Sequence, residues 1–286
     1  ARRITRLLPS ALAVVAVVAV STPVLLPSVE RDAAAVQQLA SLFSVQNWAL
    51  VFQSVDYLSA DASPTPLEHF WSLATEEQFY LVWPMVFLGL ALLTRALGRK
   101  RIIVIGGMVA IAALSFAYCV WLSVDSPGAA YFNTGTRAWE FLTGAILCFA
   151  PRLSDRYWSV LTIVGWVLLG SSIVLLTPAV VYPGWLAAVP VLGTALVIWA
   201  GRAPRGSVVE RAYEHPIVSY LASRSYAVYL WHWPALLLIP AAAGIVGGPS
   251  GLDPLGLLVV LGVSLVLAEA SYRLLERRFR VTGVSA

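Results

Sequence analysis

Eight apolar runs, each close to the length that crosses a lipid bilayer, dominate this sequence. Because a helix rises 1.5 Å per residue, about 20 apolar residues cross the ~30 Å hydrocarbon core of a membrane. The pattern therefore predicts an all-α polytopic membrane protein with about eight transmembrane helices. The runs lie at about 7–27, 78–97, 102–123, 137–151, 157–177, 184–201, 224–246 and 255–275.

Composition excludes the soluble class. Hydrophobic residues make up 59% of the chain and charged residues 12%, with a mean hydropathy of +0.79. A typical soluble domain has about 25% charged residues. A chain this apolar has too little polar surface to cover itself in water. The net charge of +4 is better explained by where the cations lie than by a nucleic-acid partner.

The first apolar run has two interpretations. It follows a basic flank and contains small residues near Ser21, as a secretory signal peptide does. The run continues through Leu26, however, and gives about 20 apolar residues from Leu7, which favours a true membrane span.

The positions of the basic residues predict the orientation. Seventeen of the nineteen Lys and Arg residues fall on one side of the predicted spans, and only Arg31 and Arg137 fall on the other. Cytoplasmic loops carry the excess of Lys and Arg in membrane proteins. We therefore expect both termini of residues 1–286 in the cytoplasm, with an even number of spans.

The longest polar connection, about 28–77, is expected outside. Val36, Leu39 and Leu42 recur there at helical spacing, which predicts a short helix lying on the outer membrane surface. The sequence contains no internal repeat, and many transporters are built from repeats. This absence weighs against a transporter.

The stretch HFWSLATEEQFYLVWP, residues 69–84, brings ionisable groups to the start of an apolar run. On a helix, Glu76 or Glu77 lies one turn from Tyr80. Acids within a span are costly and by default face a cavity or a partner. The alternative is that both glutamates are hydrated at the outer headgroup level. His69 by itself has the character of a loop histidine.

Further polar groups lie in the runs that follow. In SYAVYLWHWP, residues 225–234, Tyr229 precedes His232 by three residues and shares its helix face. Arg137 and Glu140, in TGTRAWEF, are spaced to form an ion pair that neutralises both charges. Glu269 and Arg273 have the same possibility in the last span, and we interpret that pair as structural.

Arg3 and Arg6 lie one turn apart at the expected cytoplasmic end of the first span. They either set the orientation next to anionic lipid or form a fork for phosphate groups. Cys119 and Cys148 show no metal-ligand spacing. We expect no metal and no permanently bound cofactor.

Several motifs in this order resemble the membrane-bound acyltransferase-3 family, the O-acyltransferases of bacterial cell-surface glycans. FWSLATEEQFYLVWP and the later SYAVYLWHWP carry the resemblance. RRITRLLPSAL is similar to the segment that opens the family's third span, and ASYRLLERRFR to the end of its last. The likeness covers essentially the whole chain, which we expect to be a single transmembrane domain over 1–286.

The chain departs from the family in one respect. Family members have ten spans, and their proposed catalytic histidine lies in an Arg-x10-His motif on the first. Neither His69, His215 nor His232 follows an arginine at that spacing. We therefore expect residues 1–286 to be an amino-terminally incomplete piece, without the first two spans, and inactive by itself.

The resemblance implies a reaction: an acyl group, usually acetyl, passes from cytoplasmic acyl-CoA to a sugar hydroxyl that faces outward. It assigns Arg3 and Arg6 to CoA binding and Glu77, Glu76 and His232 to catalysis, with Glu77 as the preferred general base. A polar path through the bundle would join donor and acceptor. We expect its walls to include His69, Trp71, Tyr80, Arg137, Glu140 and Tyr229.

The implied partners are acyl-CoA, a cell-surface polysaccharide or glycolipid and membrane lipid, in a bacterial cytoplasmic membrane, without nucleic acid. Two other functions remain open. A transporter or flippase of lipid-linked sugar would use the same path without chemistry. A purely structural scaffold would leave the acids and histidines at membrane depth unexplained.

Overall fold

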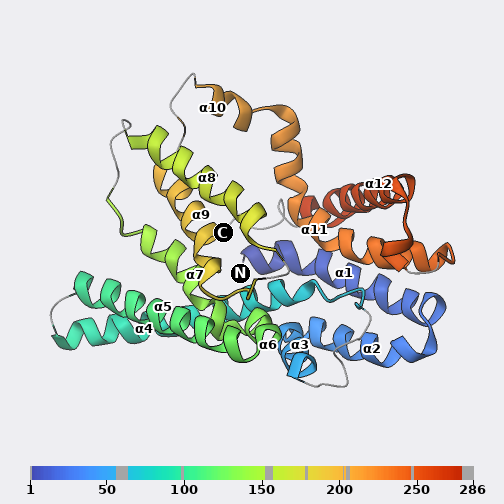
Figure 1. Ribbon diagram of the computed structural model, residues 1–286, viewed down its shortest axis with the longest axis horizontal. Coiled ribbons are helices and arrows are strands. Elements are labelled where there is room, and N and C mark those ends of the chain that lie inside the picture. The colour runs from blue at the N-terminus through green and yellow to red at the C-terminus, as the bar shows by residue number, and fades with distance from the viewer. Residues whose placement is uncertain are drawn as a thin grey trace. The chain divides into compact units, whose positions relative to one another are not determined.

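The computed structural model describes residues 2–55, 64–97, 100–151, 157–177, 180–201, 203, 207–245 and 248–278, and within these ranges it leaves out the side chains of 2–6, 54–55, 95–97 and 100. The described residues form helices and connecting turns, without a strand among them (Figure 1). The all-α expectation is confirmed.

A helix occupies each of the eight apolar runs. Five of them are long and apolar enough to cross a membrane, and the apolar helix at Trp185–Ala200 is shorter. The count of eight spans and the cytoplasmic termini stay predictions. The helices at these runs are α1 (Arg2–Leu25), α4 (Phe70–Leu97), α5 (Lys100–Asp125), α7 (Thr134–Leu147), α8 (Trp158–Leu175), η3 with α9 (Trp185–Ala187 and Ala188–Ala200), α11 (Pro216–Ala242) and α12 (Pro254–Ser271).

Two helices begin eight residues before the predicted runs. α4 begins at Phe70 rather than near residue 78, so Glu76 and Glu77 lie inside a candidate span, Phe70–Thr94, and not in the outer connection. α11 begins at Pro216, where the ring fixes a helical φ and His215 Nδ1 accepts a hydrogen bond from Ile217 N. Hydropathy missed both starts because polar residues interrupt the apolar pattern, at Thr75, Glu76 and Glu77 in α4 and at Ser219 and Ser223 in α11.

The connection that we expect outside the membrane contains the predicted helix. α2 (Ser28–Leu42) buries Ala34, Gln37 and Ala40 on one side, while apolar residues at Val36 and Leu39 are exposed. This arrangement matches the expected amphipathic helix. Three further short helices, α3 (Gln46–Val55), α6 (Pro127–Phe132) and α10 (Val208–Tyr213), were not anticipated.

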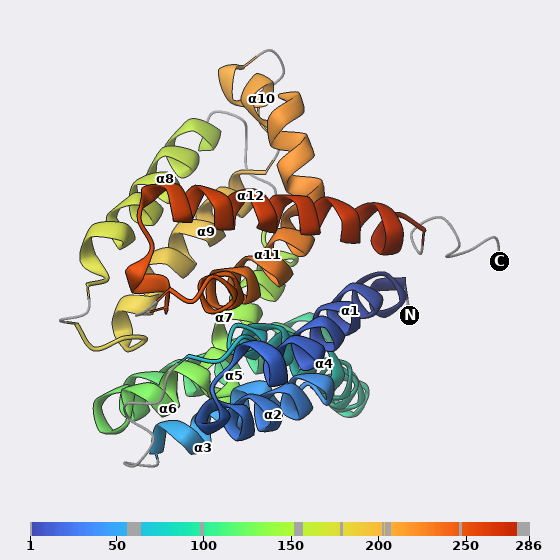
Figure 2. The same cartoon turned by 90° about the vertical axis from the view of Figure 1, so that its right-hand side faces the viewer.

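The chain divides into two compact units. The first unit contains Ala1–Ala49, Asp61–Trp71 and Ala212–Ala286. Within it, α1 packs against α2 and α11, and α11 packs along α12 (Figure 2). A 3-10 turn, η4 (Gly248–Gly251), precedes α12, and a π-helical turn, η5 (Tyr272–Glu276), follows it and contacts α1.

The second unit contains Leu50–Ala60 and Ser72–Arg211. α5 packs along α7 and contacts the short α6 (Pro127–Phe132), and α8 packs along α9. Gly165 and Gly193 allow the close approach of α8 and α9, because a Cβ on Gly165 would lie 2.8 Å from Gly193 O. Small residues at such contacts are typical of membrane helices.

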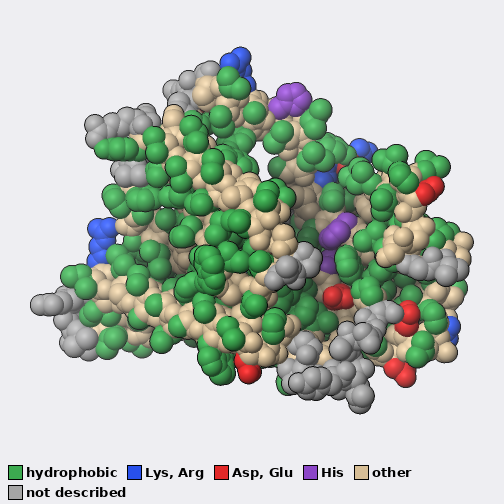
Figure 3. All heavy atoms as spheres, viewed as in Figure 1, with side chains coloured by type: hydrophobic (Ala, Val, Ile, Leu, Met, Phe, Trp, Pro, Cys, Tyr) green, Lys and Arg blue, Asp and Glu red, His purple; other side chains and the backbone are tan. Residues whose placement is uncertain are grey.

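Hydrophobic side chains cover much of the visible surface (Figure 3). Val20 and Val24 on α1, Ile173 on α8 and Val266 on α12 are among those exposed. Contiguous apolar surface of this extent has a favourable solvent only in lipid. The helices therefore present the kind of outer face that a bilayer solvates.

Candidate functional site

Two histidines, one buried and one partly buried, lie side by side in the first unit. His69, directly before α4, is 7% exposed. Its ring centroid lies 5.4 Å from that of His232 on α11, with the rings nearly perpendicular. Tyr229, one turn earlier on α11, has its ring 5.3 Å from His69 and 5.5 Å from His232. The fold thus brings His69 and Tyr229, which the sequence assigned to the polar path, together with His232, which it assigned to catalysis.

Backbone carbonyls fix the tautomers of both imidazoles. His232 Nδ1 lies 2.6 Å from Tyr229 O, and His69 Nε2 lies 3.2 Å from Leu230 O. A carbonyl oxygen only accepts, so each of these nitrogens carries the proton. In the neutral ring, His232 Nε2 therefore presents a lone pair. A sugar hydroxyl could donate its proton to that nitrogen.

The segment before α4 is fastened to α11. The Tyr229 hydroxyl donates to His69 O at 2.6 Å, and Trp233 Nε1 donates to Thr65 O at 2.9 Å. Both donors come from the motif that contains His232. One helical turn of α11 therefore fixes the position of His69.

A second set of polar side chains holds the same segment from α2 and α3. The Thr65 hydroxyl donates to Gln37 Oε1, which also accepts from Gln46 Nε2 at 2.6 Å. Gln37 and Gln46 are buried, and buried amides of this kind are stabilising only when paired. Sequence reasoning missed both glutamines, because an isolated Gln in an amphipathic helix carries no signal of its partner.

Burial makes His69 a neutral residue. Desolvation, with a further contribution from the charge of His232, lowers the pKa of His69 to about 3. Desolvation also raises the pKa of the neighbouring Glu68. A histidine with so low a pKa is a poor proton acceptor, so His69 orients and confines His232 rather than titrating with it.

The acidic motif on α4 lies in the second unit. The Tyr80 hydroxyl donates to Glu76 Oε1 at 2.5 Å. Glu77 is exposed, and Trp71 is partly buried. The role of Glu77 as the preferred base stays a prediction. Glu76 is the acid that Tyr80 contacts.

The acidic motif contacts α7 through the two residues that follow the glutamates. The Thr134 hydroxyl donates to Gln78 Oε1 at 2.6 Å. Phe79 stacks on Phe141 with centroids 4.7 Å apart. The first two turns of α7 therefore lie beside the EEQF stretch.

Arg137 and Glu140 form the predicted ion pair on α7, with Nη1 and Oε1 2.8 Å apart. Arg137 Nε also donates to Tyr131 O at 3.2 Å. The guanidinium carbon lies 4.9 Å from the centroid of the Tyr131 ring and 5.9 Å from that of Tyr182. Aromatic faces at these distances attract a cation.

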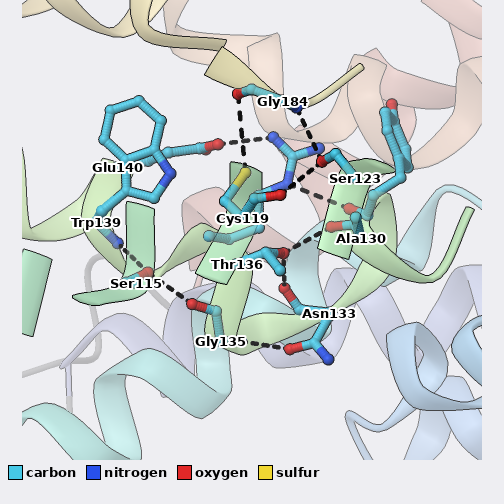
Figure 4. Close-up of polar contacts among 12 residues, drawn as sticks. Ser115, Cys119, Ser123, Ala130, Asn133, Gly135, Thr136, Trp139, Glu140 and Gly184 are labelled. Carbon is cyan, nitrogen blue, oxygen red and sulfur yellow. Dashed lines mark hydrogen bonds and ion pairs between the residues drawn. The ribbon is translucent and has the colours of Figure 1, made fainter. Parts of the chain in front are cut away.

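Two serines on one face of α5 position this ion pair (Figure 4). Ser115 Oγ donates to Gly135 O at 2.6 Å and accepts from Trp139 N at 3.0 Å. Ser123 Oγ accepts from Gly184 N at 2.9 Å, which holds the loop that carries Tyr182. Asn133 caps α7 by accepting from Gly135 N. These bonds fix the first turn of α7, and therefore the position of Arg137 on that helix.

The remaining predicted groups differ in outcome. Glu269 pairs with Arg273 as expected, and it also accepts from Arg224 Nε at 2.8 Å, which joins α11 to α12. The side chains of Arg3 and Arg6 lie outside the described residues. The described part of the chain contains no group of three or more His, Cys, Asp or Glu residues placed to hold a metal.

Helices of membrane-crossing length with histidines and an ion pair in their interior define a polytopic membrane protein with buried polar sites. The sequence profile of the acyltransferase domain family, the acyltransferase-3 type, matches residues 1–270. The chain belongs to this family.

Curated relatives are similar over nearly the whole chain. The peptidoglycan O-acetyltransferase OatA of Listeria monocytogenes is 29% identical over 99% of this chain and 46% of its own length. The putative peptidoglycan O-acetyltransferase YrhL of Bacillus subtilis is 30% identical over 99% of this chain and 45% of its own. A putative O-acetyltransferase of Staphylococcus aureus is 26% identical over 100% of this chain and 48% of its own. The chain thus spans less than half the length of these relatives. No solved structure matches it.

Proposed function

We propose that the protein transfers an acyl group, acetyl by analogy with the names of its relatives, from cytoplasmic acyl-CoA to a hydroxyl of an outward-facing glycan. Family membership and the relatives named as peptidoglycan O-acetyltransferases support this function. The acceptor class by the same analogy is a cell-wall polysaccharide or its lipid-linked precursor. The cytoplasmic membrane is the location that joins such a donor and acceptor.

The orientation of His232 is the observation that carries the proposal. Its Nδ1 donates to Tyr229 O, so Nε2 is the acceptor in the neutral ring. His69 and Tyr229 enclose the ring on the protein side, while His232 itself is only partly buried. A fixed, accessible imidazole lone pair is what a general base for an alcohol requires.

The step balances with His232 as the proton carrier. The acceptor O–H gives its proton to Nε2 as the oxygen forms a bond to the thioester carbonyl carbon. The carbon–sulfur bond then breaks, and the CoA sulfur leaves with the electron pair. The imidazolium returns the proton to that sulfur, which yields the O-acyl sugar and free CoA thiol.

The other predicted residues have supporting roles in this proposal. Glu76, Glu77 and Tyr80 would bind acceptor hydroxyls, because carboxylates accept and a phenol both donates and accepts. Trp71 would contribute an aromatic surface for a sugar ring. Arg3 and Arg6 would bind the phosphates of CoA, to which guanidinium is well matched.

The decisive experiment uses the full natural chain that contains residues 1–286, reconstituted in lipid nanodiscs with acetyl-CoA and a peptidoglycan fragment. Free thiol release that depends on the acceptor measures transfer. We expect His232→Gln to lower the rate by about 10²–10⁴-fold, the usual contribution of a general base. His215→Asn is the matched control, since His215 is exposed at the start of the same helix and Asn retains the capping acceptor.

Two results would contradict the proposal at different levels. Wild-type activity in His232→Gln would remove this residue from the proton transfer and leave the acyltransferase function standing. If the wild type released no thiol in response to acceptor and instead moved lipid-linked sugar across the bilayer, the protein would be a flippase and not an acyltransferase.

A further inference from the structure

A groove lies between α7 and α9 in the second unit, where α9 packs mainly against α8 and α7 mainly against α5. Its volume is about 410 Å³, within the range of ligand sites. Its walls are one face of each helix. α7 contributes Phe141, Gly144 and Leu147, and α9 contributes Val191, Ala195 and Ile198.

The groove has a polar end and an apolar length. Arg137, Glu140 and Tyr182 line one end, and the lining of α7 continues to Leu147. Ten residues of helix separate Arg137 from Leu147, so the groove follows α7 for about 15 Å. A groove with a polar end and a mostly apolar length suits an amphiphile that has a hydrocarbon chain.

The chemistry of the polar end favours a neutral headgroup. Glu140 neutralises Arg137 at 2.8 Å, so this end carries no net charge with which to attract a phosphate. Carboxylate oxygens accept hydrogen bonds from hydroxyls, and the partly exposed Tyr182 offers a ring face. These groups suit a sugar better than the phosphate of a phospholipid.

We propose that the α7–α9 groove binds a lipid-anchored saccharide, with its hydrocarbon chain along the groove and its sugar at Arg137 and Glu140. The inference rests on the proposed function in one respect: this ligand, a glycolipid whose sugar is joined to its lipid without a phosphate, would be the acceptor of the acyl group. The contacts between α7 and the EEQF stretch, at Gln78 and Phe79, place the sugar end beside the predicted acceptor-binding acids.

Gly144 provides a direct test of the groove. A Cβ added at Gly144 would meet no atom within 4 Å, and the same holds for Gly170 on α8. Leucine at position 144 therefore fills the groove without a clash at its first carbon. Gly170→Leu is the matched control, because it makes the same change on a helix of the same unit outside the groove.

Binding of radiolabelled n-decyl glucoside to the full chain in nanodiscs, corrected for empty discs, is the measurement. We expect saturable binding to the wild type and to Gly170→Leu, and at least tenfold weaker binding to Gly144→Leu. Thr194→Leu, which narrows the groove from the α9 side, should weaken binding in the same way. Methyl glucoside and decanol should each compete at least tenfold less well than n-decyl glucoside.

The competing occupants are separate outcomes. Equal binding to Gly144→Leu and wild type would place the ligand elsewhere and overturn the inference. Competition by lysophosphatidylcholine or decanol at least as strong as that by n-decyl glucoside would make the groove a general lipid site. Because binding is measured without acyl-CoA, a protein that binds the glycoside but releases no thiol would contradict the proposed function alone.

Discussion

Replacement of His69 by glutamine should remove a specific part of the acid sensitivity of the fold. His69 has a pKa of about 3 when folded, against 6.5 for an ordinary histidine, chiefly because burial disfavours the charged ring. Below about pH 6.5, His69 is protonated in the unfolded chain, whereas in the folded chain it is protonated only near pH 3. The free energy of unfolding therefore falls as the pH falls through this window.

The size of the effect follows from the same two pKa values. Proton uptake by the unfolded state lowers the free energy of unfolding by less than about 0.1 kcal/mol at pH 7.5. Between about pH 7.5 and pH 5.5 it lowers this free energy by about 1.4 kcal/mol more. Glutamine keeps an amide nitrogen able to donate to Leu230 O and does not titrate. Over this pH range, the free energy of unfolding of His69→Gln should therefore fall by about 1.4 kcal/mol less than that of the wild type.

Reversible unfolding in detergent micelles at the two pH values measures this difference. Comparing each protein with itself cancels the constant cost of the substitution, and His215→Asn controls for the loss of an exposed histidine. The same loss of stability in His69→Gln and in the wild type would mean that His69 is protonated in the folded chain. The premise that His69 is a buried, neutral residue that orients His232 would then be wrong.

Three further substitutions test the packing that holds these sites. Tyr229→Phe removes the hydroxyl that donates to His69 O and should cost about 1 kcal/mol of unfolding free energy; an unchanged midpoint would show that the segment before α4 is held by other bonds. Glu140→Gln leaves its arginine partner buried without a counter-charge and should cost about 3 kcal/mol, measured by chemical unfolding, whereas a loss near zero would mean that the arginine is hydrated. Gly165→Ala should cost about 1–3 kcal/mol by overpacking α8 against α9, while Gly170→Ala, in open space, should cost none; equal melting temperatures for the two variants would contradict the close helix contact.

Periodicity and hydropathy predicted the existence of the helices and failed at two of their starts. The failures at α4 and α11 have one cause: polar residues such as Glu76 and Ser219 interrupt the apolar pattern within the first two turns, as residues of a water-facing connection also would. Helix signals of another kind were available. Pro216 is a favoured first helical residue, and His215 caps it.

The candidate sites were predictable only where partners lie one turn apart. Glu140 with Arg137 and Tyr229 with His232 follow from i, i+3 spacing on a helix. The contact of His69 with His232 joins residues 163 positions apart, and Gln37 with Thr65 joins residues from different elements. No local pattern encodes such pairs, because they depend on how the helices pack.

Charges inside this bundle serve two different purposes, and burial alone does not distinguish them. Glu269 accepts from Arg224, Arg273 and the Tyr220 hydroxyl, so most of its acceptor capacity is used in fastening α11 to α12. Such a clamp is sufficient reason for a charge at membrane depth. Glu140 has the same ion-pair chemistry but lines a groove. Arg137 and Glu140 are therefore candidates for ligand binding because a groove lies beside them, and not because a buried charge is costly.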